Sequence, residues 1–190
     1  MNRILRDIVI AASAALVARR FIAATKVSGD SMFPELHDGD KLLLNKTAYG
    51  SKGPEYGDVV VFNEPGKKDK YLIKRVIGLP GDHIVIRNGE ISVNGEKTND
   101  DFTADGATNG DIDMKVPEGR YFLLGDNRLH SRDSRDASIG CVPLDSIAGK
   151  VDIRLYPPGR VFRRELFGDT EDIAENTDAA PEGQTESIEE

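Results

Sequence analysis

Lys74 is the residue whose position most strongly suggests chemistry. It lies inside an apolar run at residues 72–77, and strand alternation places it on one face with Leu72 and Val76, while Arg75 lies on the other. Lysine is almost never fully buried unless it is paired. The position therefore indicates either a side chain whose amine reaches water or a desolvated general base, because burial disfavours the ammonium form.

A serine that such a base could activate lies in a turn at residues 27–34. Gly29 permits close backbone approach and Pro34 stiffens the exit, so the turn presents the Ser31 hydroxyl. A serine in this setting is also a common turn residue without a chemical role. As a nucleophile, the hydroxyl would need an adjacent base, which an uncharged lysine can supply.

A third polar group fills the loop at residues 125–135. These eleven residues include two Asp, one Asn, two Ser and three Arg, directly after an apolar run at residues 120–124. The loop is either solvated or a hydrogen-bonded network that fixes a nearby side chain. In the second case, Ser131 would donate or accept a hydrogen bond beside Lys74.

Composition argues against several other kinds of site. The 33 acids and 25 Lys and Arg give a net charge of −8, but residues 169–190 hold nine of the acids, so the remainder carries only +1. That balance lacks the basic excess of nucleic-acid-binding proteins. A single Cys, Cys141, excludes an internal disulfide and, with only three scattered His, argues against a Cys/His zinc site. We expect no metal, no cofactor and no nucleic-acid partner.

The elements that must position these groups are predicted to be strands. Apolar runs bounded by Gly, Asp and Pro recur along the chain without alternating helices, and Asn88-Gly89 between two such runs is a strong hairpin signal. We expect a mainly β protein, with an antiparallel sheet or barrel-like core and a small inserted β-hairpin lobe at residues 83–118. Residues 169–190 lack apolar periodicity, which predicts a disordered acidic tail.

The N-terminus has a different pattern. Residues 8–18 carry no charge, and the longer stretch 4–22 would reach about 28 Å as a helix, close to the ~30 Å of a bilayer's hydrocarbon core. A membrane anchor, a cleaved signal and a buried helix all fit this pattern. Arginines flank both ends, so the positive-inside rule does not fix an orientation.

Four blocks of this sequence resemble those of type I signal peptidases (leader peptidases), most closely the shorter Gram-positive-like form. They follow the family's order: GDSMFP at 29–34, YGDVVVF at 56–62, LIKRVIGLPGD at 72–82 and GDNRLHSRDSR at 125–135. The resemblance covers about residues 4–156. Two positions depart from the pattern, since some relatives have Ser where this chain has Gly29 and most have Thr where it has Glu35.

The resemblance implies a serine endopeptidase with a Ser-Lys dyad that uses neither His nor metal. Ser31 matches the nucleophile, Lys74 the general base and Ser131 the hydroxyl that orients the amine. The supporting matches are Asp133 and Arg135, a charged pair, and Gly125, Asp126 and Asn127, the start of the loop. The oxyanion would be held by the Ser31 backbone N–H and a second donor that stays open.

The resemblance also implies a substrate and a location. The family cleaves exported preproteins after small residues (Ala-X-Ala-like), and our candidates for lining the apolar cleft are Val27, Met32 and Leu36. The resemblance implies an anchor helix at 1–24 and a peptidase domain at 25–156. We expect an extension at 157–168 and the acidic tail at 169–190 to follow. The protein would cross the plasma membrane once, in contact with the lipid bilayer, with a cytoplasmic N-terminus and an extracytoplasmic catalytic domain.

Two alternatives stay open at this stage. One is a Ser-Lys peptidase dedicated to a narrow set of secreted components. The other is a catalytically silent, membrane-tethered β-domain that binds extracellular partners, in which Lys74 would have no role.

Overall fold

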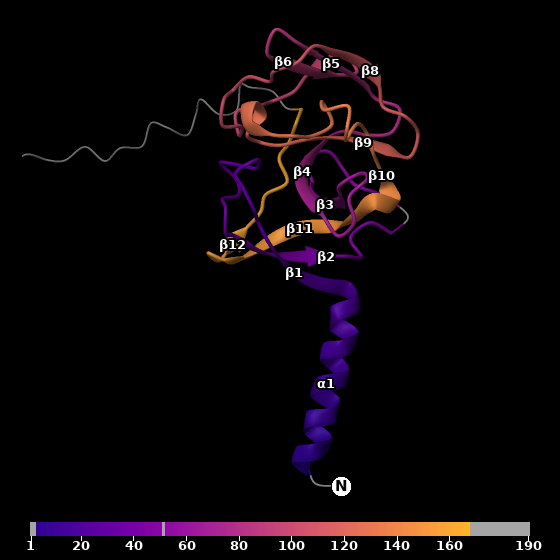
Figure 1. Ribbon diagram of the computed structural model, residues 1–190, viewed down its shortest axis with the longest axis vertical. Helices are drawn as coiled ribbons and strands as arrows, with labels where there is room; N and C mark the ends of the chain where they lie inside the picture. The colour runs from indigo at the N-terminus through magenta and orange to yellow at the C-terminus, as the bar shows by residue number, and fades with distance from the viewer. Residues whose placement is uncertain (1–2, 51, 168–190) are drawn as a thin grey trace, which may run out of the picture.

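The computed structural model describes residues 3–50 and 52–167, and these residues form two antiparallel sheets and one long helix (Figure 1). The prediction of a mainly β, antiparallel protein is confirmed. The predicted acidic tail at 169–190 lies outside the described residues.

The larger sheet has eight strands in the order β1-β2-β11-β3-β4-β9-β10, with β12 pairing with β11. The strands are β1 (Ile22–Lys26), β2 (Lys41–Asn45), β3 (Val59–Asn63), β4 (Tyr71–Gly78), β9 (Arg120–Leu124), β10 (Val142–Pro143), β11 (Ile147–Tyr156) and β12 (Gly159–Arg160). The strand that carries Lys74, β4, lies between β3 and β9. Its central residues are therefore covered on both edges by other strands.

The smaller sheet has the order β7-β6-β5-β8. Its strands are β5 (His83–Arg87), β6 (Glu90–Val93), β7 (Glu96–Lys97) and β8 (Ile112–Lys115). The hairpin between β5 and β6 turns at Asn88 and Gly89, which both have positive φ, as a two-residue hairpin turn of this kind requires. The sheet falls inside the lobe predicted at 83–118, while the division of the chain into domains stays a prediction.

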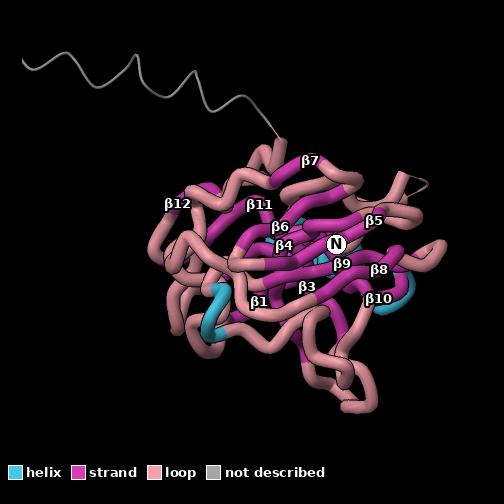
Figure 2. Tube along the Cα trace, turned by 90° about the horizontal axis from the view of Figure 1, so that it is seen from above, coloured by secondary structure: helices cyan, strands magenta, loops and turns pink. Residues whose placement is uncertain are grey.

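The two sheets share one hydrophobic cluster. Ile84 and Ile86 of β5 pack with Ile77 of β4 and with Phe122 and Leu124 of β9, all of them buried. Figure 1 shows the small sheet at the end of the β body away from the helix, and Figure 2 shows the strands of both sheets overlapping when seen along the perpendicular direction. The small sheet thus packs on the strands that carry the polar groups.

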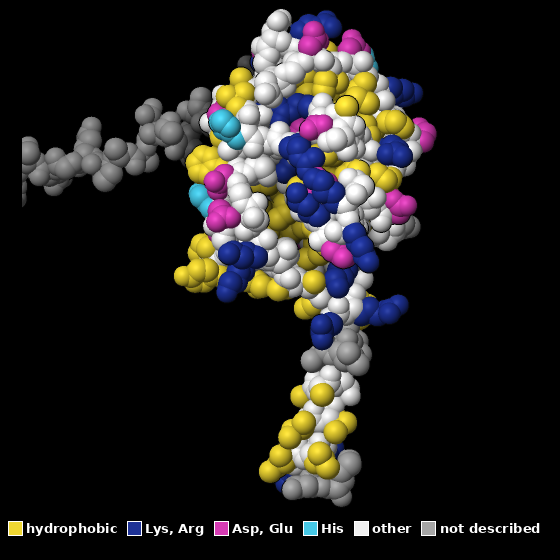
Figure 3. Space-filling view, viewed as in Figure 1, with side chains coloured by type: hydrophobic (Ala, Val, Ile, Leu, Met, Phe, Trp, Pro, Cys, Tyr) yellow, Lys and Arg dark blue, Asp and Glu magenta, His cyan; other side chains and the backbone are white. Residues whose placement is uncertain are grey.

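Helix α1 (Arg3–Phe21) projects from the β body, and its apolar side chains Ile4, Leu5, Ile8, Val9 and Ile10 are exposed. Figure 3 shows hydrophobic side chains along the helix and basic side chains where it meets the body. β1 begins directly after it, at Ile22, inside the segment predicted as an anchor. Within the described residues, hydropathy identifies no helix long and apolar enough to cross a membrane.

Candidate active site

Ser31 lies in the turn that connects β1 to β2. Gly29 adopts a positive φ of 82°, and its N–H donates to the Asp38 carboxylate at 2.8 Å, which closes the turn across nine residues. On the other side of Ser31, the buried side chains of Met32 and Leu36 anchor the segment in the core. We call residues 29–36 the nucleophile loop.

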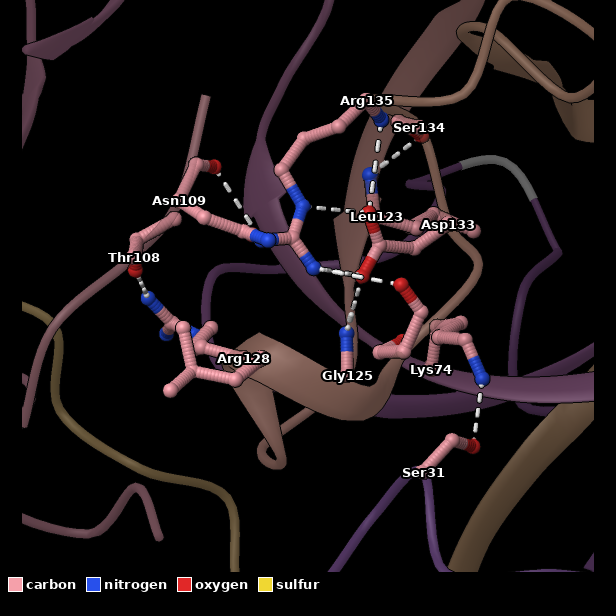
Figure 4. Close-up of polar contacts among 12 residues, drawn as sticks. Ser31, Lys74, Thr108, Asn109, Leu123, Gly125, Arg128, Asp133, Ser134 and Arg135 are labelled. Carbon is pink, nitrogen blue, oxygen red and sulfur yellow. Dashed lines mark hydrogen bonds and ion pairs between the residues drawn. The ribbon is translucent and has the colours of Figure 1, made fainter. Parts of the chain in front are cut away.

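Lys74 meets Ser31 from β4. The Lys74 Nζ atom lies 2.6 Å from Ser31 Oγ (Figure 4). It also donates to the backbone carbonyl of Ile73 at 2.8 Å. The two residues are 43 positions apart in the sequence, so the sheet and the nucleophile loop together create the contact. This is hydrogen-bonding distance for a serine hydroxyl and a lysine amine.

The surroundings of Lys74 favour its uncharged form. The residue is 2 % exposed, and burial lowers its pKa from 10.5 to about 8. Asp133 and Asp126 act in the opposite direction, while Arg132 and Arg135 reinforce the lowering. The uncharged form of the amine is therefore accessible near neutral pH.

Arg75, on the other face of β4, is also fully buried but is paired. Its Nε and Nη2 atoms donate to the two carboxylate oxygens of Asp126 at 2.8 and 2.6 Å. Its Nη1 atom donates to the carbonyls of Gly57 at 2.8 Å and Phe162 at 2.9 Å. This bidentate ion pair fixes β4 to the start of the 125–135 loop.

The 125–135 loop approaches the nucleophile loop closely. Asn127 donates through Nδ2 to the Asp30 carbonyl at 3.0 Å and through its backbone N–H to the Ser31 carbonyl at 3.2 Å. A Cβ atom on Gly125 would lie 2.3 Å from the Ser31 carbonyl oxygen, so only glycine fits this approach without a shift. Gly125 and Asn127 therefore hold the backbone of Ser31.

Asp133 and Arg135 form the predicted charged pair. The buried Asp133 carboxylate accepts from Arg135 Nε and Nη2, both at 2.8 Å, and from the Gly125 N–H at 3.1 Å (Figure 4). Arg135 also donates to Asn109 and to the Ser131 carbonyl. The pair closes the loop on itself and holds Gly125 in place.

Ser131 lies in the same cluster, but its hydroxyl has no hydrogen-bond partner among the residues the structure describes. Its Oγ is buried, and a Cβ atom on Gly125 would lie only 2.2 Å from it. The orienting role predicted for Ser131 stays a prediction.

Val27, Met32 and Leu36, the candidates for the substrate cleft, pack into the hydrophobic cluster beneath the nucleophile loop. All three are buried in the free protein. Contact with a substrate therefore stays a prediction for each of them.

Sequence reasoning missed three features of this region. The first is Arg75 as the partner of Asp126, and the second is Glu64, a buried carboxylate that accepts from Arg132 of the 125–135 loop. The third is Glu35, whose carboxylate binds residues near the end of the described chain. A cation in an apolar strand was the available signal for Arg75, but the sequence offered no means of choosing its partner.

Among residues 3–50 and 52–167, no group of three or more His, Cys, Asp or Glu is arranged to hold a metal ion. The arrangement places a serine hydroxyl next to a buried lysine amine on an antiparallel β scaffold. Among the described residues, that amine has no carboxylate partner. This is the arrangement of Ser-Lys hydrolases, in which the amine replaces histidine as base.

Comparison with known proteins identifies the family. The family model described as "Signal peptidase, peptidase S26" matches residues 1–156. The chain is 37% identical over 164 residues to Signal peptidase I S of Bacillus subtilis, covering 80% of this chain and 87% of that protein. It is 40% identical over 145 residues to Signal peptidase I of Bacillus caldolyticus, covering 69% and 78%. It is 35% identical over 161 residues to Signal peptidase IB of Staphylococcus aureus, covering 75% and 82%. The chain belongs to the signal peptidase S26 family.

Proposed function

We propose that this protein removes signal peptides from exported preproteins, with Ser31 as the nucleophile and Lys74 as the general base. The observation that carries the assignment is the 2.6 Å contact between Lys74 Nζ and Ser31 Oγ, made by a lysine that is 2 % exposed. A hydroxyl becomes a competent nucleophile when a base within hydrogen-bonding reach can take its proton.

The mechanism follows from that contact. Ser31 Oγ attacks the carbonyl carbon of the scissile bond while its proton passes to the neutral Lys74 amine. The Ser31 N–H, which donates to none of the described residues, is free to bind the oxyanion. The Lys74 ammonium then gives its proton to the departing amine. In the second half, a water attacks the acyl carbon while Lys74 takes one of its protons. The bond between the acyl carbon and Ser31 Oγ then breaks, the Lys74 ammonium returns the proton to Ser31 Oγ, and the signal peptide leaves with a new carboxyl end.

The acids of the cluster support this cycle from a distance. Asp133 and Asp126 raise the pKa of Lys74, against the larger effect of burial. They therefore stabilise the ammonium that forms during each proton transfer, while burial keeps the neutral form of the amine accessible near neutral pH. Asp133 also fixes Gly125, and Asp126 fixes β4 through Arg75.

The organisation we propose keeps α1 as the anchor within residues 1–24, with the peptidase domain at 25–156 including the lobe at 83–118, and the extension at 157–168. Exposed apolar side chains along α1 and exposed Arg19 and Arg20 at its end support an anchoring role. The catalytic domain would lie on the extracytoplasmic side of the plasma membrane, where exported chains are trimmed. Membrane fractionation of the full chain and of a variant lacking residues 1–21 tests this part.

Cleavage of a synthetic preprotein tests the catalytic assignment. The wild type should cut after an Ala-X-Ala sequence, whereas Ser31→Ala and Lys74→Ala should stay folded and lose turnover. A substrate with Leu in place of the last Ala serves as the control and should resist the wild type. Cleavage by Lys74→Ala at the wild-type rate would overturn the assignment, and a folded wild type without any cleavage would favour a silent binding domain.

A further inference from the structure

The family match ends at residue 156, yet the chain that follows packs against the site. We call residues 161–167 the C-terminal strap. Val161 is buried in the cluster that contains Met32 and Leu36 of the nucleophile loop, and Leu166 is buried in the cluster shared by the two sheets. In Figure 1 this segment (yellow) runs from β12 toward the small sheet. The strap thus runs from the hydrophobic cluster beneath the nucleophile loop to the cluster shared by the two sheets.

Glu35 connects the nucleophile loop to the strap. Its side chain is 7% exposed, and its carboxylate accepts from the Phe162 N–H at 3.2 Å and from Arg164 Nη2 at 2.7 Å. The Glu35 backbone carbonyl also accepts from Arg154 of β11 at 3.4 Å. A carboxylate this buried needs such partners, so the contact defines the position of the loop four residues after Ser31.

Phe162 of the strap also contacts β4, the strand that carries Lys74. The Phe162 carbonyl accepts from Arg75, next to Lys74, while the Phe162 N–H donates to Glu35. Gly57 makes the approach of the strap possible, because a Cβ atom there would lie 1.8 Å from the Arg164 carbonyl oxygen. One backbone residue, Phe162, therefore bridges the segments that carry the two reacting groups.

We propose that Glu35 is a positioning residue, which holds Ser31 against Lys74 by tying the nucleophile loop to Arg75 through the C-terminal strap. This inference rests on the proposed function. Glu35 touches neither reacting group. It acts because a small displacement of the loop changes the Ser31–Lys74 distance, and catalysis is steeply sensitive to such misplacement.

The test compares three variants of the full chain on the same synthetic preprotein. Glu35→Ala removes the contact, Glu35→Gln keeps an oxygen for the Phe162 N–H but loses the charge facing Arg164, and Glu55→Ala is the matched control. Glu55 also pairs with an arginine of the strap, Arg163, but both side chains are exposed and neither contacts the nucleophile loop. The readouts are kcat, KM and amide hydrogen exchange of residues 29–36.

Glu35→Ala should lower kcat by about tenfold with little change in KM, because the placement of the reacting groups is impaired while the substrate cleft is kept. Amide exchange should rise in residues 29–36 without rising across the sheets. The kcat and the amide exchange of Glu35→Gln should lie between those of Glu35→Ala and the wild type. Both quantities should be the same in Glu55→Ala as in the wild type. If Glu35→Ala fails to fold, the same readouts are compared between Glu35→Gln and Glu55→Ala. A lower kcat in Glu35→Gln alone would then support the positioning role.

A wild-type kcat in the folded Glu35→Ala variant would overturn the inference, as would an equal loss in Glu55→Ala. A wild type that cleaves nothing would instead count against the proposed function. In that event the exchange measurement still decides whether Glu35 holds the nucleophile loop, so the two failures are distinguishable.

Discussion

The two faces of β4 each bury a basic side chain, in different surroundings. On one face, Arg75 has the bidentate carboxylate of Asp126 and two backbone carbonyls. On the other, Lys74 has the hydroxyl of Ser31 and one carbonyl, and among the described residues no carboxylate lies within ion-pair distance of it. Both residues are almost fully buried.

The difference indicates how one strand can provide both structure and reactivity. A buried guanidinium remains charged and requires an acid, so Arg75 acts as a structural tie. A buried ammonium without an acid loses its proton more readily, which supports the role of base that we propose for Lys74. Two differences therefore distinguish the structural residue from the reactive one: arginine in place of lysine, and the Asp126 carboxylate on the side of Arg75 alone.

The largest effect should come from Lys74→Met, which keeps the volume of the side chain and removes the amine. Loss of the base should lower turnover by about 10⁴-fold, as for other members of catalytic sets. Stability should move in the opposite direction. Because the folded-state pKa is lowered from 10.5 to about 8, protonation favours the unfolded chain below pH 10.5. The variant should therefore gain up to about 3 kcal/mol at pH 7.

This gain should shrink as the pH rises from 8 to 10.5, where the unfolded lysine also becomes neutral. Urea unfolding of both proteins across this range measures it. A variant that is less stable than the wild type at pH 7 would mean that Lys74 acts as a paired, charged residue like Arg75.

Arg75→Met should have the next largest effect, and on stability. It leaves the Asp126 carboxylate buried without its partner, which costs about 3–5 kcal/mol in such sites. The double variant Arg75→Met/Asp126→Leu should recover much of that loss, since it removes the stranded charge as well. If the single and double variants unfold at the same urea concentration, the ion pair does not have the structural role described above.

Gly125→Ala should have a moderate effect on both stability and turnover. The added methyl meets the Ser31 carbonyl at 2.3 Å, and overpacking of this kind costs about 1–3 kcal/mol. The nucleophile loop should also shift, which lowers kcat. Gly50→Ala is the matched control, since a Cβ atom there meets nothing within 4 Å. Equal behaviour of the two variants in melting and turnover would contradict the close approach at Gly125.

The smallest effect should be the change of kcat/KM of the wild type for each unit of pH. In the mechanism that we propose, the active form has a neutral Lys74, whose pKa is lowered by burial to about 8. Below that value, kcat/KM should rise about tenfold per pH unit, and above it the rate should level off. A rate independent of pH between 6 and 8 would contradict a base of this pKa.

The sequence was enough to predict the antiparallel β class, the hairpin at Asn88-Gly89 and the two alternatives for Lys74. These features are encoded locally, in alternation and turn chemistry. The strand β1 was not predicted, because its residues Ile22–Lys26 include two alanines and follow the helix without a break. Its pairing with β2 is what makes it a strand.

The contacts that close the site could not be predicted in the same way. Arg75 and Asp126 are 51 residues apart, and Glu35 and Arg164 are 129 apart. Such pairs depend on how the sheet and the C-terminal strap fold back, and several other acids and arginines in the sequence were equally eligible partners. The family resemblance selected Asp126 as a site residue, but it did not indicate which residue it pairs with.

The central claim is that burial beside Ser31 lowers the pKa of the Lys74 amine, so that its neutral form is accessible near physiological pH. NMR titration of the protein labelled with ¹³C at the lysine Cε tests it directly, with the Lys74 signal assigned by its loss in Lys74→Met. The expected midpoint for this one lysine is about 8. A midpoint near the ordinary lysine value of about 10.4 would contradict it.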